Sequence, residues 1–237
     1  MLGLPTGVRA CLFDLDGVLT QTAKVHAAAW QEMFDGYLRE RAATSGERFV
    51  PFDPVMDYDD YVDGKPRTDG VRSFLESRHI TVPDEAVEDM AERKDRLFLD
   101  LIHRHGVQTY DGTVRYVHSA RAAGLKVAVV SSSKHATDVL RAAKLDGLFD
   151  GQVDGNVAER EHLRGKPAPD TYLKAAEMLD ATAPKSAVYE DALAGVEAGR
   201  AGGFGLVIGI DRVGQAEALR RHGADIVVND LAELMAD

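Results

Sequence analysis

The sequence predicts an α/β fold, in which a doubly wound, mostly parallel sheet carries an inserted all-helical cap domain. Short apolar runs alternate with helical patterns over much of the 237-residue chain, which is typical of parallel strands joined by crossover helices. One long stretch after the first strand breaks this alternation and holds helical patterns only. Several strands also end at charged or hydroxyl side chains, where open sheets of this kind place their chemistry.

Five strands are expected, each a short and nearly continuous apolar run, as in sheets that are covered on both faces. They span residues 8–13, 125–130, 187–189, 205–208 and 226–228. Four helices are expected around the later strands, at residues 115–123, 134–143, 171–179 and 192–201. The alternation of the two kinds of element predicts parallel strand pairing.

The stretch that breaks the alternation predicts a second domain. We expect a catalytic core from residues 1–22 and 107–237, and a helical cap domain from residues 23–106. The insertion enters directly after the first strand and its acidic turn, so we expect a lid over a site at that turn. The alternative is a helical subdomain that only adds core. Its helices are expected at residues 25–41, 68–78 and 84–104, with a loop containing the acidic run 57–60.

Composition argues against several classes of protein, although a local basic pocket remains compatible with an acidic chain. The formal net charge of −11 at pH 7 argues against binding through nucleic-acid phosphates or an acidic membrane surface. Cys11 is the only cysteine, so no internal disulfide can form, which fits a reducing compartment. The sequence has no apolar run of membrane-spanning length and no signal-peptide pattern at its start. We expect a cytoplasmic monomer without nucleic-acid or membrane partners.

The first strand ends at a turn with two carboxylates. Asp14 and Asp16 are two residues apart and are followed by Gly17. Side chains at this spacing point the same way on an extended chain. Two like charges this close repel unless a cation or a shared proton compensates. The turn therefore indicates a metal-assisted or proton-sharing site.

Two later segments suit an anion such as phosphate. Ser131, Ser132, Ser133 and Lys134 follow the strand at 125–130, and hydroxyls with backbone amides at a helix start can bind an anion. A serine at such a place can also be only a helix cap. Lys166 stands before a turn stiffened by two prolines. It suits a fixed cation for phosphate, the alternative being a solvated surface lysine.

A fourth segment adds two carboxylates. Glu190 and Asp191 end the strand at 187–189, and either could be an ordinary helix cap. Together with Asp14 and Asp16 they supply the hard oxygen ligands that Mg²⁺ prefers.

These four segments resemble the four motifs of the haloacid dehalogenase superfamily of phosphotransferases, as Asp14-x-Asp16-Gly17, Ser131, Lys166 and Glu190-Asp191. The resemblance implies a Rossmannoid core of that superfamily with a cap inserted after the first motif. It implies that Asp14 attacks phosphorus to form an aspartyl-phosphate and that Asp16 is the general acid and base. It further implies that Ser131 and Lys166 hold the transferring phosphoryl group.

The same resemblance implies a metal centre. Mg²⁺ would be held by the Asp14 carboxylate, the Asp16 backbone carbonyl and Asp191, with Glu190 supporting. These residues are the expected metal site.

The opening at residues 13–30, the Gly64-x-x-Arg67 loop and Lys94 resemble the β-phosphoglucomutase subfamily. The resemblance implies that His26 positions Asp16, that Arg67 binds the non-transferring phosphate, and that Lys94 reaches the substrate from the cap. It assigns Ser132, Ser133 and Lys134 to that phosphate or the sugar. Each cap residue has a plainer alternative: an ordinary helix histidine, a surface arginine, and a lysine on a solvated charged face.

The implied activity converts β-glucose 1-phosphate to glucose 6-phosphate through an aspartyl-phosphate and a bisphosphate intermediate. The partners would be a small phosphosugar and a glucose bisphosphate primer. Such a substrate needs two anion sites, and a guanidinium suits the second because it binds phosphate in a fork. The first alternative is a Mg-dependent phosphatase of small phosphosugars. A non-catalytic phosphosugar-binding protein is another, against which the complete set of motif residues argues.

Overall fold

The structure is a computed structural model that describes residues 2–235. The chain divides into two compact units, with cuts after Gln21 and after Gly106. The smaller unit is Thr22–Gly106, and the larger unit combines the described residues before and after it.

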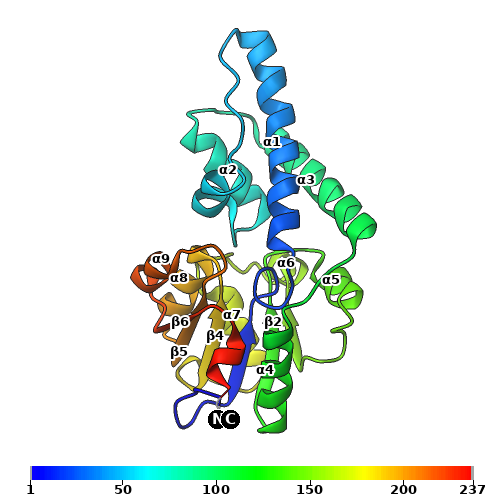
Figure 1. Ribbon diagram of the computed structural model, residues 1–237. Helices are drawn as coiled ribbons and strands as arrows, with labels where there is room; N and C mark the ends of the chain where they lie inside the picture. The colour runs from blue at the N-terminus through cyan, green and yellow to red at the C-terminus, as the bar shows by residue number, and fades with distance from the viewer. Residues whose placement is uncertain (1, 236–237) are drawn as a thin grey trace. The chain divides into compact units, whose positions relative to one another are not determined.

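The larger unit contains a parallel six-stranded sheet in the order β3-β2-β1-β4-β5-β6 (Figure 1). Its pairings are parallel throughout the described strands, which confirms the predicted α/β fold class. The strands are β1 (Ala10–Phe13), β2 (Lys126–Val130), β3 (Gly151–Val153), β4 (Ser186–Glu190), β5 (Leu206–Ile210) and β6 (Ile226–Val228).

Helices cover both faces of this sheet. On one face, Leu12 of β1 shares a buried cluster with Tyr172 and Val196. On the other face, the ring of Phe13 meets the ring of Tyr116 edge-on, with centroids 6.3 Å apart. Tyr172, Val196 and Tyr116 lie on α7, α8 and α4 in that order. The helical elements of this unit are α4 (Asp111–Ala122), α5 (Ala136–Ala142), α6 (Gly155–Arg160), α7 (Asp170–Met178), η2 (Ala183–Lys185), α8 (Leu193–Ala201), α9 (Ala216–His222) and η3 (Leu231–Leu234).

The sequence does not predict β3, α6 or α9. Strand β3 has three residues, of which Gly151 and Gln152 are only half-buried. A run this short, with a glycine and an amide, shows neither the apolar continuity nor the alternation that identifies a strand.

The smaller unit is built from helices. Its elements are α1 (Ala23–Ser45), η1 (Tyr58–Val62), α2 (Arg67–Ser77) and α3 (Asp84–His105). Aromatic rings form its core: Phe34 stacks on Trp30 with centroids 5.3 Å apart and contacts Phe74 at 4.1 Å. None of the helices in the described part of the chain has both the length and the apolar character needed to cross a membrane.

The acidic run expected in a loop lies partly on a helical turn. Asp59 and Asp60 belong to η1, a single π-helical turn. Burial raises the pKa of Asp59 to about 6, and the nearby charges of Asp60 and Asp53 add to this effect. The run is therefore more ordered than its composition suggests.

The chain leaves and re-enters the larger unit at adjacent positions. The Gln21 backbone N–H donates to the Gln108 carbonyl at 2.8 Å, and the Gln21 side-chain amide donates to the Thr109 carbonyl at 3.1 Å. The Tyr110 N–H donates to the Leu19 carbonyl at 3.0 Å. The two linking segments therefore run side by side up to the cuts.

Candidate active site

Three neighbouring strands bring the predicted site residues to one edge of the sheet. Asp14 directly follows β1, Ser131 follows β2, and Glu190 ends β4. Strand β1 lies between β2 and β4 with parallel pairing on both sides. The Asp14 backbone N–H donates to the Tyr189 carbonyl at 3.0 Å, so the ladder holds Asp14 at the end of the strand.

Lys166 forms the centre of this group. Its Nζ donates to the carboxylates of Asp14 and Glu190 and lies 3.4 Å from the Val130 carbonyl oxygen. The Lys166 side chain is 1% exposed, so the alternative of a solvated surface lysine is wrong. Lys166 itself lies in the loop before α7, so this loop adds a further segment to the site.

Burial and charge act against each other here. Burial raises the pKa of Asp14 well above its usual range, the Lys166 ammonium lowers it, and the charges of Glu190 and Asp16 raise it further. Burial alone would lower the pKa of Lys166, but the two carboxylates outweigh it and raise that pKa. One permanent positive charge is thus shared by two buried carboxyl groups.

A group of buried carboxylates can hold a metal ion. Oxygen atoms of Asp14, Glu190 and Asp191 lie within 4.8 Å of one another. Glu190 is already engaged, since its Oε1 accepts from the Tyr172 hydroxyl at 2.7 Å and its Oε2 from the Ala192 N–H at 3.2 Å. Buried carboxylate oxygens at this spacing fit a hard divalent cation. The Asp16 carboxylate is not a member of this group.

The turn after β1 is packed against the Asp191 loop. Gly17 has φ of +88°, and a Cβ at this position would overlap the Asp191 carboxylate. The Gly17 N–H donates to the Thr20 carbonyl at 2.7 Å, and the Thr20 hydroxyl donates to the Leu15 carbonyl at 3.1 Å. Only glycine allows this close approach. Asp16, in the same turn, is half-buried.

The serine segment forms a turn and not the start of a helix. Ser131 Oγ accepts from the Ser133 N–H at 3.1 Å, and Ser133 Oγ accepts from the His135 N–H at 3.1 Å. Helix α5 begins at Ala136 with His135 as its N-cap residue, so the helix is present but starts later than residue 134, and none of these serines is its N-cap residue. Ser132 is half-buried.

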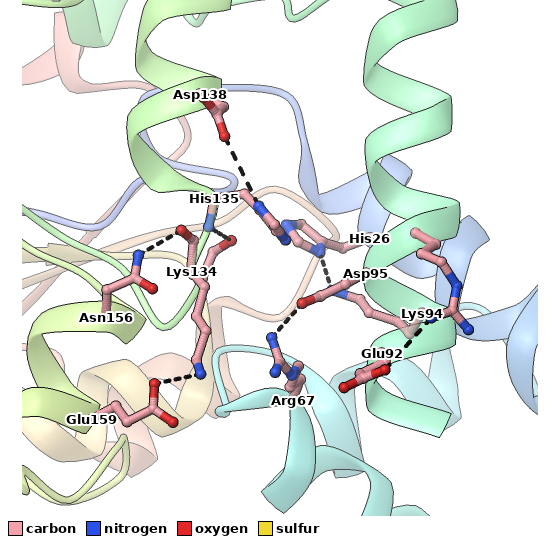
Figure 2. A network of polar contacts seen from close by, with 12 residues as sticks. His26, Arg67, Glu92, Lys94, Asp95, Lys134, His135, Asp138, Asn156 and Glu159 are labelled. Atoms are coloured by element: carbon pink, nitrogen blue, oxygen red, sulfur yellow. Dashed lines mark hydrogen bonds and ion pairs between the residues drawn. The ribbon is translucent and has the colours of Figure 1, made fainter. Parts of the chain in front are cut away.

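Lys134 is paired with Glu159, a carboxylate outside the four motifs. Its Nζ lies 2.6 Å from Glu159 Oε2 on α6, and the Asn156 side-chain amide donates to the Lys134 carbonyl at 2.8 Å (Figure 2). An anion bound by Lys134 must therefore share or displace Glu159.

In the smaller unit, the predicted cap residues His26 and Lys94 are in contact (Figure 2). Lys94 Nζ lies 2.7 Å from His26 Nδ1 and 5.2 Å from the centre of the Trp30 ring. The His26 ring stacks on Phe98 with centroids 3.9 Å apart. Lys94 is 5% exposed, so the alternative of a solvated charged face is wrong for this residue.

Arg67, the third predicted cap residue, forms an ion pair with Asp95 (Figure 2). Lys94 Nζ lies 3.9 Å from the other oxygen of Asp95. Arg67 and Lys94 are thus joined through one carboxylate. The expected contact of His26 with Asp16 would join the two units and stays a prediction.

The sequence does not single out several residues that touch the predicted site residues, among them Tyr172, Asp95 and Glu159. Tyr172 belongs to the apolar face of α7 by its spacing, and only its hydroxyl distinguishes it. Asp95 and Glu159 lie in charged runs, where a pairing partner cannot be told from its neighbours.

Comparison with known proteins gives a consistent result. Residues 8–203 match the family model of haloacid dehalogenase-like hydrolases. The chain is 56% identical to a β-phosphoglucomutase of Mycobacterium bovis, over 99% of this chain and 94% of that protein. It is 29% identical to a β-phosphoglucomutase of Bacillus subtilis, over 96% and 92%. The crystal structure of β-phosphoglucomutase from Clostridium difficile shares the fold, with a TM-score of 0.78, 24% identity, and coverage of 96% and 93%.

Proposed function

The chain belongs to the haloacid dehalogenase-like hydrolase family and, within it, to the β-phosphoglucomutases, and from this premise we propose that it converts β-glucose 1-phosphate to glucose 6-phosphate. The observation that carries the proposal is the buried group of Asp14, Lys166 and Glu190 at the carboxyl edge of the sheet. Phosphoryl transfer through the protein requires a nucleophile beside fixed positive charge.

We assign the chemical steps to Asp14 and Asp16. An Asp14 carboxylate oxygen bonds to phosphorus while the bond from phosphorus to the sugar oxygen breaks, which leaves an aspartyl-phosphate. Asp16 gives a proton to the departing sugar oxygen. In the return step Asp16 takes the proton of the sugar hydroxyl that attacks the aspartyl-phosphate. A half-buried Asp16 beside a buried Asp14 suits this division of roles.

The remaining core residues balance charge. Lys166 keeps its proton and faces the oxygens of the transferring group, and Ser131 donates its hydroxyl proton to one of them while its Oγ accepts from Ser133. Asp14, the Asp16 backbone carbonyl and Asp191 would hold Mg²⁺, with Glu190 behind them. When bound, Mg²⁺ supplies positive charge that lets an anionic carboxylate approach an anionic phosphate.

A mutase must present both ends of its substrate to Asp14. The first transfer therefore needs a glucose bisphosphate as primer, and the bisphosphate intermediate turns round before the second. We assign residues 1–22 and 107–237 to the catalytic core and 23–106 to a cap that closes on the substrate. In this assignment Arg67, His26 and Lys94 bind from the cap, and Ser132, Ser133 and Lys134 from the core. We further propose that the protein is a monomer and that it acts in the cytoplasm.

The Arg67–Asp95 pair leads to a testable prediction. Arg67→Met is expected to lower kcat/KM by about 10-fold to 100-fold, because a hydrogen bond to a charged group contributes about 1.5–3 kcal/mol. Asp95→Asn is expected to lower KM, because Asp95 competes with phosphate for the guanidinium. Steady-state kinetics with β-glucose 1-phosphate measure both.

Arg72→Met is the matched control for Arg67→Met. Arg72 lies on the same helix and pairs with Asp84, but its side chain is 44% exposed. Its replacement is expected to leave both constants unchanged. An Arg67→Met variant that behaves like this control would contradict the role of Arg67.

A coupled assay tests the proposed activity. The purified chain receives Mg²⁺, β-glucose 1-phosphate and a catalytic amount of glucose 1,6-bisphosphate, and formation of glucose 6-phosphate is followed beside release of free phosphate. We expect glucose 6-phosphate to form faster than phosphate and only with primer. Phosphate release without isomerisation of several β-sugar 1-phosphates would establish the phosphatase alternative.

A further inference from the structure

A loop outside the four motifs forms hydrogen bonds to both acidic loops of the candidate metal centre, the loop after Asp14 and the loop at Asp191. This loop, residues 211–215, follows β5, and we call it the β5 loop. Arg212 Nε donates to the Gly17 carbonyl at 2.8 Å, and Gln215 Nε2 donates to the Asp191 carbonyl at 3.1 Å. We propose that the β5 loop is a clamp, in which Arg212 and Gln215 are positioning residues that hold the Asp14 and Asp191 loops at the separation a divalent cation needs.

The Arg212 side chain is held on several sides. Its Nη1 donates to the Asn229 carbonyl at 2.8 Å and lies 3.9 Å from the Asp230 carboxylate. Its guanidinium lies 3.5 Å from the centre of the Tyr110 ring, and its side chain is 13% exposed. A surface arginine would be free to change its conformation, whereas these contacts hold the guanidinium beside the Gly17 carbonyl.

The backbone of the β5 loop is itself fixed. Asp211 Oδ1 accepts from the Gly214 N–H at 2.7 Å and from the Gln215 N–H at 2.8 Å. Asp211 directly follows β5, so the loop is anchored to the sheet. Gln215 therefore donates to the Asp191 carbonyl from a rigid support.

The two acidic loops need such a support because their charges repel. Gly17 lies so close to Asp191 that a Cβ would overlap its carboxylate, while Asp14 and Asp191 present like charges within 4.8 Å. Without a cation, this repulsion favours separation of the loops. Bonds to their backbone carbonyls resist that separation without using a carboxylate oxygen. Groups that orient metal ligands in this way typically change metal affinity by about 10-fold to 100-fold when replaced.

The clamp rests on the proposed function, since it concerns the Mg²⁺ site assigned there. Its test is calorimetric titration of the full chain with MgCl₂, well below the unfolding temperature. Arg212→Met is expected to weaken Mg²⁺ binding by about 10-fold, and Gln215→Leu by a smaller factor. Arg212→Lys is expected to restore part of the affinity, because its ammonium can still donate to one carbonyl.

Arg220→Met is the matched control for Arg212→Met. Arg220 lies on α9 just after the β5 loop and pairs with Glu217, but both side chains are more than half exposed. Its replacement is expected to leave the affinity for Mg²⁺ unchanged. Thermal unfolding in the presence of a chelator shows how much of each effect is loss of stability.

The outcomes separate the clamp from the proposed function. Wild-type affinity in both Arg212→Met and Gln215→Leu, whatever their unfolding temperatures, overturns the clamp and leaves the metal site standing. If Arg212→Met does not fold, Gln215→Leu and Arg212→Lys decide on the same criterion. A wild-type chain that binds no Mg²⁺ overturns the metal site of the proposed function, and the clamp with it.

Discussion

Asp14→Asn is expected to lower turnover by at least about 10⁴-fold, because an amide cannot form the covalent bond to phosphorus on which the proposed mechanism depends. The same variant is expected to be more stable than the wild type when metal is absent. Both effects follow from one property of Asp14: it is a buried carboxyl group that must react in its charged form.

The sign of the stability effect follows from the pKa of Asp14. Burial raises this pKa above that of an unfolded aspartate, so folding favours the protonated form. The folded state is therefore penalised increasingly as pH rises from the unfolded pKa toward the folded one, and the penalty is full above both. A neutral asparagine removes the penalty and leaves Lys166 paired with Glu190. We expect a gain on the order of 1 kcal/mol near neutral pH, as for other substitutions that relieve strained sites.

Two measurements check this prediction. Turnover is measured in the primed assay, and thermal unfolding is followed in a chelator. Asp154→Asn is the matched control, since Asp154 is also a buried aspartate directly after a strand, where it caps α6. Asparagine caps helices equally well, so the control should retain both activity and stability. An Asp14→Asn variant that turns over at the wild-type rate would locate the nucleophile elsewhere.

Lys166→Met is expected to cost about 3–5 kcal/mol of the free energy of unfolding in the absence of metal. Removing one partner of a buried charge pair leaves the other charge uncompensated. Here the loss is shared by Asp14 and Glu190, which both contact Lys166 Nζ at a site that is almost fully buried. Adding Glu190→Gln should restore a large part of the stability, because the double variant buries one carboxyl group fewer. Turnover should be lost in both variants.

The chain offers a close control for the effect of burial. Lys174 also lies between two carboxylates, Glu161 at 2.9 Å and Glu177 at 3.2 Å, but its side chain is 24% exposed and the two acids more so. Lys174→Met should leave the free energy of unfolding almost unchanged, as is usual for ion pairs near the surface. Urea unfolding followed by circular dichroism measures all the variants. Equal losses for Lys166→Met and Lys174→Met would show that burial of the charges is not what matters.

The sequence predicts the strands that carry the site because each one is apolar and ends abruptly. Asp14, Ser131 and Glu190 all stand where an apolar run stops, and parallel pairing then brings them to one edge. The sequence does not predict strand β3, because three residues that include a glycine carry no periodic signal. The sequence also does not predict the helical turn Tyr58–Val62, because the acidic composition of this segment resembles that of a loop.

Contacts between residues that lie far apart in the chain cannot be predicted from a single sequence. Tyr172 reaches Glu190 from a helix face that otherwise only packs on the sheet. Arg212 meets Gly17 from 195 positions away in the chain. Neither contact follows from local spacing, since each depends on which strands become neighbours. A charged residue directly after a strand outside the motifs, such as Asp211 or Arg212, is the one signal that points to the β5 loop.

The two linking segments that run side by side at Gln21 and Gln108 have a consequence for how such enzymes can diversify. The entropy cost of closing a loop grows only slowly with the length of the loop, so an insert whose ends lie side by side can vary in length at little cost. We therefore expect the sheet unit to tolerate replacement of the compact unit Thr22–Gly106. Chimaeras can join this sheet unit to the insert of a relative after Gln21 and after Gly106. They should keep the phosphoryl-transfer chemistry and acquire the relative's preference among sugars.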